Sequence, residues 1–513
     1  MKAPSTHADA SPSVRVSTGV EGLDAILGGG LPPGHLYLVE GTPGTGKTTL
    51  ALQFLLAGAR NGLRGVYVTL SESRQELHEV AISHGWSLDD IEIIELSADT
   101  GAADEMYTVF HPAELELQET MSAVLEAIDH SKPSLVVLDS LSEMRLLARD
   151  PLRFRRQILA LKHFFTGRAS TVLLLDDKSG AEGDLQLHSL AHGVLLLEHV
   201  ALEYGAERRR LQVTKLRGLR FWGGYHDFRI RTGGVVVYPR IGPGKSSRHH
   251  QVRLLESGSP PLDRLLGGGL QEGSSMLIIG AAGTGKSVLS TQYACAATAR
   301  GERVRFYLFD ERLNSFLLRS EGLGMDLREP LGDGRLTLQQ VEPTEMSPGE
   351  FANEVARAID EDDVRMIIID SINGYMQSMP EERLLPIQVH ELLSFLANRR
   401  VTCIMTLVQQ GIFGNPVDDA AEISYLADSV LLLRYFEVLG SVRQALSVVK
   451  KRSGNHERTI RECRVTHGGL SVGEPLTEFQ GVLTGVPQYI GTVGPLMRND
   501  SDRSSPHAMD SNR

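Results

Sequence analysis

Short apolar runs alternate with longer helical patterns along this 513-residue chain. Four of the runs, LYLVE, GVYVTL, SLVVLD and STVLLLD, lie at residues 36–40, 65–70, 134–139 and 170–176. Their nearly continuous apolar character indicates strands that are buried on both faces. The stretch TTLALQFLLAGAR at 48–60 instead places apolar residues at helical spacing. This alternation predicts an α/β fold in which helices flank a mainly parallel sheet.

The whole pattern occurs twice. Residues 26–53 read ILGGGLPPGHLYLVEGTPGTGKTTLALQ, and residues 265–292 read LLGGGLQEGSSMLIIGAAGTGKSVLSTQ. Lys286 lies 239 positions after Lys47, and further matching blocks follow in the same order at slightly different offsets. The chain is therefore predicted to be a duplication of one α/β domain, with insertions and deletions in its loops.

A turn-rich basic stretch separates the two copies, and polar segments stand at both ends. Such compositions are typical of linkers and tails. We predict a disordered N-terminus, a first domain, a linker, a second domain and a disordered tail at residues 1–13, 14–238, 239–251, 252–494 and 495–513.

Two strings, at residues 41–48 and 280–287, fit the pattern G-x-x-x-x-G-K-[ST] of phosphate-binding loops. Each follows an apolar run and opens a helical pattern, so its backbone N–H groups and the helix start can surround an anion. Lys47 and Lys286 are expected to reach the β- and γ-phosphates of ATP. The predicted nucleotide-binding residues of the two loops are Gly41, Thr42, Gly44, Thr45, Gly46, Lys47, Thr48, Thr49, Gly280, Gly283, Thr284, Gly285, Lys286, Ser287 and Val288.

Asp139 and Asp370 each close a later apolar run. In a parallel sheet that position brings a carboxylate to the edge where the phosphate loop lies. Together with the hydroxyls of Thr48 and Ser287, these carboxylates are predicted to hold Mg²⁺. The alternative is that each aspartate caps the element that follows.

Hydrolysis or phosphoryl transfer also needs a group that orients or deprotonates the attacking oxygen. Glu72 and Glu311 follow the second apolar run of their copies, again 239 positions apart. Asp310 adds a second carboxylate in the second copy, where the first copy has Ser71. We predict that Glu72, Asp310 and Glu311 are catalytic; the alternative is that they are solvated loop carboxylates.

Basic residues recur late in each copy, as Lys215 with Arg217 and Lys450 with Arg452. A cation supplied by a neighbouring subunit can stabilise the γ-phosphate in the transition state. These residues are candidates for that role, and solvated basic hairpins are the alternative.

The composition excludes several classes of protein. The formal net charge is −12, so the chain does not have the overall excess of basic residues that is typical of a non-specific DNA-binding protein. The three cysteines are too few and too far apart for a disulfide framework or a zinc ribbon. No apolar run reaches the ~18 residues of a membrane span. We expect a cytoplasmic protein without a membrane segment.

These motifs together resemble the KaiC family, the double-domain RecA-like ATPases of the circadian clock, from about Thr18 to Ile490. The marks are TGVEGLD, both phosphate loops, LDS and IDS after the two aspartates, GAERRRLQVTKLRG, and YFEVLGSVRQALSVVKKRSGNHERTIRE. The resemblance implies two tandem RecA-like P-loop NTPase domains and a homo-hexameric double ring with ATP and Mg²⁺ at subunit interfaces. It also implies slow hydrolysis in the first ring, reversible transfer of phosphate to Ser and Thr in the second, and clock or signalling partners.

The resemblance assigns further residues and exposes departures. It implies that Lys215, Arg217, Lys450, Arg452 and His456 reach the γ-phosphate held by the adjacent subunit. In the first copy Ser71 stands where the family has a second acid, and Phe221 stands where it has a histidine.

The family's phosphorylated Ser-Thr pair falls on Ser424-Tyr425, and a further family threonine is replaced by Asp419. Ser424 is therefore the single candidate phosphorylation site. The alternative is that it caps a helix.

We predict an ATP-driven timing or signalling switch that hydrolyses ATP slowly, with serine/threonine autokinase activity in the second domain. One alternative is a RecA- or RadA-like DNA-dependent ATPase, for which the linker offers the basic residues Lys245, Arg248, His249 and His250. The other is a non-hydrolysing ATP sensor or assembly scaffold.

Overall fold

The computed structural model describes residues 15–96, 112–148, 150–178, 184–201, 205–242, 253–377, 385–409, 423–438, 440–482 and 488–490. The chain divides into two units at Arg240 and Ile241. The predicted termini and most of the predicted linker lie outside the described residues, and so does Asp419.

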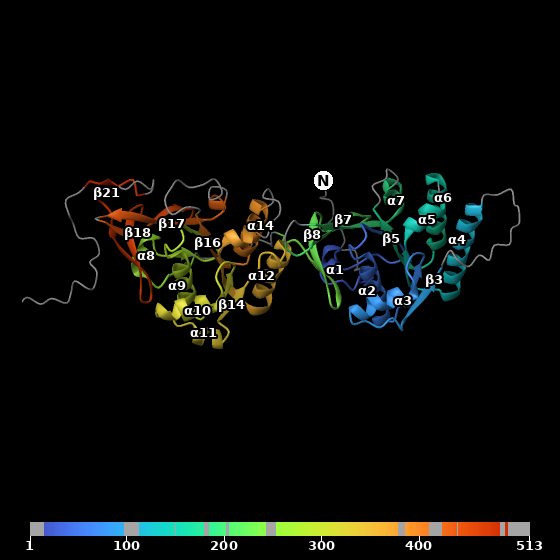
Figure 1. The fold of residues 1–513 in the computed structure, drawn as a ribbon, viewed down its shortest axis with the longest axis horizontal. Helices are drawn as coiled ribbons and strands as arrows, with labels where there is room; N and C mark the ends of the chain where they lie inside the picture. Colours follow the sequence, from blue (N-terminus) through green and yellow to red (C-terminus); the bar gives the residue numbers. More distant parts are fainter. Residues whose placement is uncertain are drawn as a thin grey trace, which may run out of the picture. The chain divides into compact units, whose positions relative to one another are not determined.

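The first unit is built on a nine-stranded sheet (Figure 1). Its strands, in spatial order, are β3 (Ile91–Glu95), β2 (Gly65–Thr69), β4 (Leu135–Asp139), β5 (Thr171–Asp177), β1 (Leu36–Gly41), β6 (Gly193–Val200), β7 (Arg208–Leu216), β8 (Tyr225–Arg231) and β9 (Gly234–Tyr238). The strands from β3 to β6 run parallel, and β7 to β9 continue the sheet antiparallel. The predicted mainly parallel sheet is confirmed.

Helices cover both faces of this sheet. They are α1 (Leu23–Ile26), α2 (Lys47–Arg60), α3 (Arg74–Ser83), α4 (Pro112–Ser131), α5 (Leu141–Ala148), α6 (Pro151–Phe165) and α7 (Asp184–Leu190). Tyr37 and Val39 of β1 pack in a core with α2, whereas Leu36 and Leu38 pack in a second core on the opposite face, with α4 to α6. Because both faces are covered, successive strand residues are all apolar.

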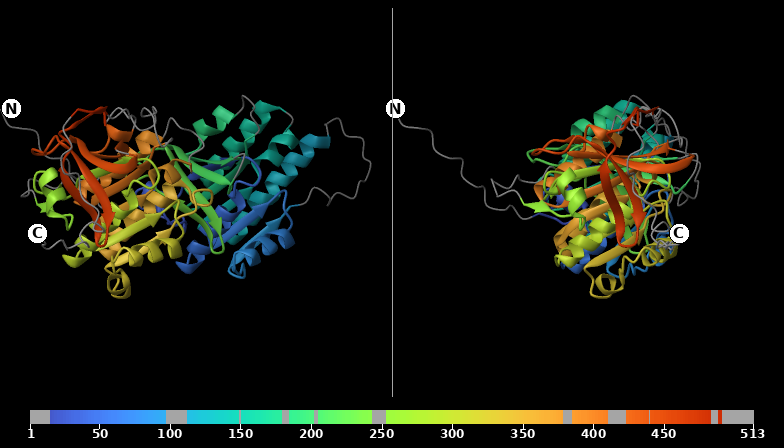
Figure 2. Two further views of the ribbon diagram at one scale, coloured as in Figure 1. Left: turned by 60° about the vertical axis from the view of Figure 1, so that its left-hand side comes forward. Right: turned by 90° about the vertical axis from the view of Figure 1, so that its left-hand side faces the viewer.

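The second unit repeats the first, strand for strand. Its sheet runs β14 (Leu336–Gln340), β13 (Arg303–Leu308), β15 (Val364–Asp370), β16 (Thr402–Val408), β12 (Ser275–Gly280), β17 (Ser429–Val438), β18 (Ser441–Lys451), β19 (Ile460–Thr466) and β20 (Gly469–Pro475). The antiparallel strands of this sheet carry the orange and red colours of Figure 2. The identical strand order confirms two tandem domains of one fold.

The helices of the second unit also form two layers. They are α8 (Pro260–Leu265), α9 (Lys286–Ala299), α10 (Leu313–Gly322), α11 (Arg328–Gly332), α12 (Pro348–Asp362), α13 (Ile372–Gln377) and α14 (Leu385–Asn398). Residues of α9 and α10 share one core, and residues of α12 to α14 share the other. Two small ribbons complete the unit, β10 (Leu254–Leu255) with β11 (Leu270–Gln271) and β21 (Phe479–Gln480) with β22 (Gln488–Tyr489).

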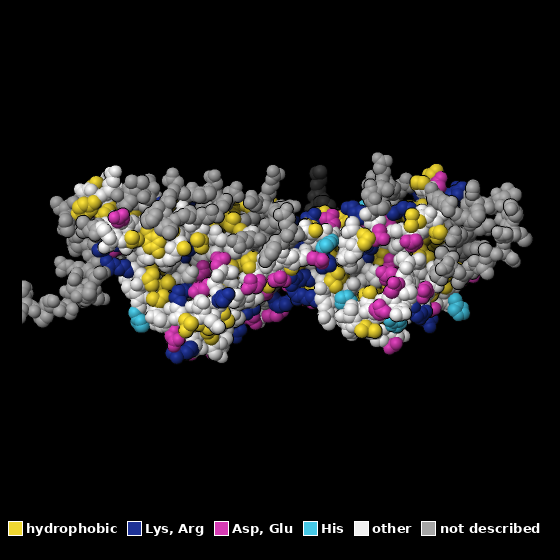
Figure 3. All heavy atoms as spheres, viewed as in Figure 1, with side chains coloured by type: hydrophobic (Ala, Val, Ile, Leu, Met, Phe, Trp, Pro, Cys, Tyr) yellow, Lys and Arg dark blue, Asp and Glu magenta, His cyan; other side chains and the backbone are white. Residues whose placement is uncertain are grey.

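The described surface is of mixed charge. On the face drawn in Figure 3, acidic and basic side chains lie interspersed, with scattered hydrophobic ones. Among the described residues, no helix combines the length and apolar character that a membrane span requires.

Candidate active site

Both predicted phosphate loops connect the central strand of their sheet to a helix. The first runs from Gly41, the last residue of β1, to Lys47, the first of α2; the second runs from Gly280 of β12 to Lys286 of α9. Gly44 and Gly46 have φ of 80° and 96°, a left-handed backbone that favours glycine. The glycines therefore allow the backbone curvature that a phosphate cradle needs.

The loop lysines are both buried, with 8% of Lys47 and 6% of Lys286 exposed. Lys47 donates to the carbonyl oxygens of Gly41 and Thr42 at 2.9 and 3.2 Å, and forms an ion pair of 2.7 Å with Asp177. Lys286 donates to the carbonyl oxygen of Ala281 at 2.8 Å, and in the described part of the chain it has no ion pair. Burial lowers the pKa of Lys286 to about 8.

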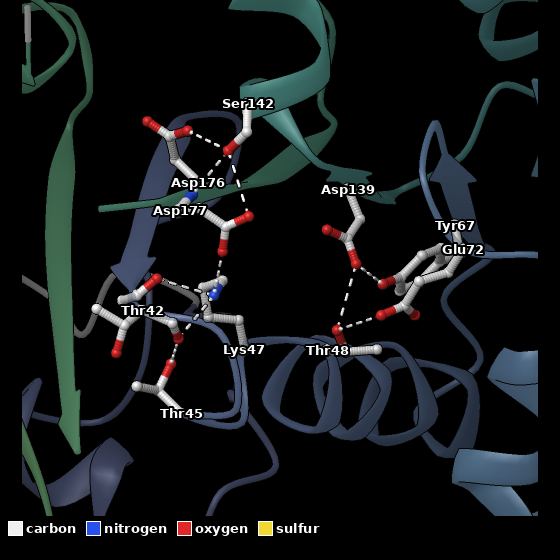
Figure 4. A network of polar contacts seen from close by, with 11 residues as sticks. Thr42, Thr45, Lys47, Thr48, Tyr67, Glu72, Asp139, Ser142, Asp176 and Asp177 are labelled. Atoms are coloured by element: carbon white, nitrogen blue, oxygen red, sulfur yellow. Dashed lines mark hydrogen bonds and ion pairs between the residues drawn. The ribbon is translucent and has the colours of Figure 1, made fainter. Parts of the chain in front are cut away.

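In the first copy three predicted residues converge beside the loop (Figure 4). The Thr48 hydroxyl lies 3.4 Å from Oε1 of Glu72 and 3.4 Å from Oδ2 of Asp139. Asp139 is buried, and it accepts a hydrogen bond from the Tyr67 hydroxyl. Glu72 follows β2 in a turn held by hydrogen bonds with Thr69, so the fold aims its carboxyl at the helix start.

Glu72 has the electrostatics of a general base. Burial, reinforced by the nearby carboxyl of Asp139, raises the pKa of Glu72 to about 7. A carboxyl that titrates near neutral pH can take a proton from water and release it again. Its Oε2 atom is buried and has no hydrogen-bond partner in the described structure, which leaves an acceptor for a ligand.

The raised pKa of Glu72 predicts a pH-dependent stability of the first unit. Between pH 4.5 and 7 the unfolded chain releases this proton while the folded chain retains it, so stability falls as pH rises. The Tm difference between Glu72→Gln and the parent should therefore grow from pH 5 to pH 8. We expect about 2–4 °C, since the partial exposure of Glu72 limits the effect to about 1 kcal/mol. The exposed Glu79→Gln serves as control in thermal melts; a pH-independent difference would contradict the assignment.

The second copy holds its carboxylates differently. Asp370 is buried and accepts from the Thr406 hydroxyl, while Asp310 accepts from Ser371. Glu311 forms a bidentate pair with Arg319, at 3.1 and 2.8 Å. The loop, these carboxylates and Arg319 line a cavity of about 800 Å³, a size that suits a nucleotide.

The late cations lie against their own chain in both copies. Lys215 donates to the carbonyl oxygens of His188 and Ala191, and Arg217 to that of Ser189, at the end of α7. Lys450 donates to the carbonyl oxygens of Ser424 and Tyr425 at 3.0 and 2.9 Å, and Arg452 donates to that of Tyr425 as well.

Lys215 and Lys450 thus contact equivalent segments, which precede β6 in the first unit and β17 in the second. His456 lies in the loop between β18 and β19, and burial, with Arg458 nearby, lowers its pKa.

The residues that depart from the family pattern lie at the surface or against the core of their own unit. Ser71 is exposed, and Phe221 packs against the core on the α2 side. Ser424 is half-buried, and Tyr425 is 55% exposed just after it.

Four residues in or beside these sites were not predicted: Tyr67, Asp177, Arg319 and Thr406. Each differs between the copies, since their counterparts are Phe306, Val408, Val80 and Leu175 by the strand register and the 239-residue offset. Aligning the two copies and looking for polar residues that face an apolar residue in the other copy would have found all four.

The residues present fit Mg²⁺ bound together with a nucleotide. The donors that converge are the oxygens of Thr48, Glu72 and Asp139, which suit a hard cation. Among the described residues, no group of three or more His, Cys, Asp or Glu forms a complete protein cage. Mg²⁺ takes one or two carboxylates and completes its shell with phosphates and water, so the oxygens of Thr48, Glu72 and Asp139 offer it a suitable set of ligands.

Comparisons with known proteins agree with this geometry. The family described as "ATPase: KaiC" matches residues 16–241 and 255–477. The chain is 26% identical over 486 residues to "Circadian clock protein KaiC3" of Synechocystis, which covers 93% of this chain and 95% of that protein. It is 26% identical over 508 residues to "Circadian clock oscillator protein KaiC" of Picosynechococcus, and 27% over 493 residues to that of Prochlorococcus marinus. The alignments cover 96% and 93% of this chain, and 97% and 96% of those relatives.

Proposed function

The chain belongs to the KaiC family of ATPases, and from this premise we propose that both of its copies bind Mg²⁺-ATP. The first copy hydrolyses ATP slowly, and the second transfers phosphate to a serine of the chain itself. The main support for the ATPase activity is the convergence of Thr48, Glu72 and Asp139 beside a phosphate loop.

In the first copy each residue has a defined task. The backbone of Gly41–Lys47 and the Lys47 ammonium hold the phosphates, and Thr48 with Asp139 holds the cation. Glu72, with its pKa near 7, takes the proton of the attacking water. Mg²⁺, when bound, neutralises charge that develops on the transferring phosphoryl group.

We place the nucleotide sites at the interfaces of a homo-hexamer, with the cation pairs at the ends of β7 and β18 facing the next subunit. In this proposal Lys215, Arg217, Lys450, Arg452 and His456 exchange part of their contacts within the chain for the neighbour's γ-phosphate. Relatives of nearly the same length are named as circadian clock proteins. A timing or signalling output through partner proteins is therefore our proposed role, and the cytoplasmic location stays a prediction.

The autokinase proposal is tested by incubation with ATP labelled on the γ-phosphate. We expect label on the protein, and we expect Ser424→Ala to lose it while the exposed Ser441→Ala retains it. Ser424 carries the one aliphatic hydroxyl that the family's Ser-Thr pair retains here, because Tyr425 stands at the threonine position. Release of free phosphate without label on the protein would reduce the function to that of an ATPase.

A second candidate, the non-hydrolysing ATP sensor, is favoured by one observation in the second copy. Glu311 is held by Arg319 in a bidentate pair, which occupies one lone pair of each carboxylate oxygen and leaves fewer for an attacking oxygen. If neither free phosphate nor labelled protein accumulates while ATP binds, the sensor is the better account. The DNA-dependent alternative rested on linker residues that lie outside the described structure, and no described feature favours it.

A further inference from the structure

The loop lysine of the first copy is paired with an acid of its own chain. The Nζ atom of Lys47 lies 2.7 Å from Oδ1 of Asp177, and Figure 4 shows the two side chains pointing toward each other. The side chain of Lys47 is 9% exposed and that of Asp177 is 40% exposed. The pair therefore lies at the mouth of the phosphate loop, with the lysine inside and the carboxylate toward solvent.

The backbone and Ser142 hold Asp177 in this position. It is the last residue of β5 and stands opposite Gly41 in the parallel pair with β1. Its N–H donates to the Ser142 hydroxyl at 3.0 Å, and its Oδ2 atom lies 3.4 Å from the same oxygen. The carboxylate is thus supported from a neighbouring helix and is not a freely rotating surface group.

The second copy keeps this support without the charge. Val408 stands opposite Gly280, as Asp177 stands opposite Gly41. The N–H of Val408 donates to Oδ1 of Asn373 at 2.7 Å, so Asn373 takes the place of Ser142. The first lysine therefore has a carboxylate in ion-pair contact, whereas the second lies near Asp370 and Asp310 but forms an ion pair with neither in the described structure.

We propose that Asp177 determines nucleotide specificity in the first copy, by competing with the γ-phosphate for Lys47. The inference rests on the proposed binding of ATP by both loops. A triphosphate that reaches Lys47 must displace the carboxylate and then lie near its negative charge, and both effects oppose binding. A diphosphate meets Lys47 through its β-phosphate alone, so it disturbs the ion pair less than a triphosphate does.

This competition gives the two copies different preferences within one chain. The second copy, whose Lys286 has no ion pair among the described residues, fills with ATP at lower concentration. The first copy binds ATP only when the ratio of ATP to ADP is high. Its occupancy therefore reports that ratio.

The test measures each loop separately in the full chain. With Lys286→Ala as background, the fluorescent analogues mant-AMPPNP and mant-ADP report on the first copy. There we expect Asp177→Asn to tighten mant-AMPPNP about tenfold and mant-ADP less than about threefold. The isosteric amide keeps the hydrogen bonds to Ser142, and the exposed Asp90→Asn removes a charge far from the lysine as the control.

The reciprocal change uses Lys47→Ala as background. Val408→Asp should weaken mant-AMPPNP about tenfold, while Val408→Asn, which adds polarity without charge, should change it little. Unchanged or weaker triphosphate binding in Asp177→Asn, or an equal gain for both analogues, would overturn the role of Asp177. Absence of any nucleotide binding in the Lys286→Ala parent would overturn the proposed function, and this inference with it.

Discussion

Replacing Lys47 and Lys286 together by alanine abolishes ATP binding, and each single replacement removes it from one copy. Each ammonium is buried at the base of a glycine-rich loop and donates to loop carbonyl oxygens, so it is aimed where phosphates are expected. A charge-assisted contact in such a site is strong, and its loss leaves the phosphate charge uncompensated. We expect affinity at the altered loop to fall at least about 100-fold.

Equilibrium binding of labelled ATP measures this effect, and the stoichiometry should fall from two to one to none. Arg60→Ala, which removes an exposed cation from the end of α2, is the control. The altered proteins should still fold, because Asp177, left without Lys47, is 40% exposed and can be solvated. Unchanged binding by the double variant would refute the phosphate-loop assignment.

Replacing Glu72 by glutamine strongly slows hydrolysis in the first copy while leaving nucleotide bound. The amide preserves the size of the side chain and can still accept from Thr48, but it cannot take a proton at any pH near neutral. Loss of a positioned general base lowers turnover by about 100- to 10,000-fold. In the Lys286→Ala background, phosphate release should therefore fall by at least about 100-fold, with the affinity for mant-ADP changed little.

The pH profile separates this role from a structural one. Hydrolysis in the parent should decline as pH falls through about 7, where Glu72 becomes protonated and loses its basicity. The residual activity of Glu72→Gln should lack that inflection. Glu79→Gln, an exposed acid on the neighbouring α3, should keep both rate and profile. An unchanged rate in Glu72→Gln would show that another group activates the water.

The two copies show how far local sequence predicts a site. Both phosphate loops are recognisable from spacing within one strand–loop–helix segment, and Asp139 and Asp370 are recognisable from their position at the end of an apolar run. The partners of the two aspartates are not. Asp139 receives its hydrogen bond from Tyr67 on the β2 side, whereas Asp370 receives one from Thr406 on the β16 side.

The same limit applies to the ion pairs. Arg319 lies on α10 and pairs with Glu311, which precedes that helix. The equivalent position in the first copy holds Val80, which cannot form such a pair. Asp177 meets Lys47 only because β5 and β1 are neighbours in the sheet, although 130 positions separate the two residues in the chain. No pattern of spacing along the chain predicts that these two residues are neighbours.

The amino-acid sequence by itself determined the duplication, the α/β class, the two phosphate loops and the family of this protein, since each depends on contiguous residues and on the period of apolar positions. The tertiary structure decided which charges face one another. It placed an acid against one loop lysine and a valine beside the other, and it left Oε2 of Glu72 without a hydrogen-bond partner in the described structure while Arg319 holds Glu311. The reason is physical: strand order and register bring together side chains from distant segments, and burial then fixes the strength of their interaction.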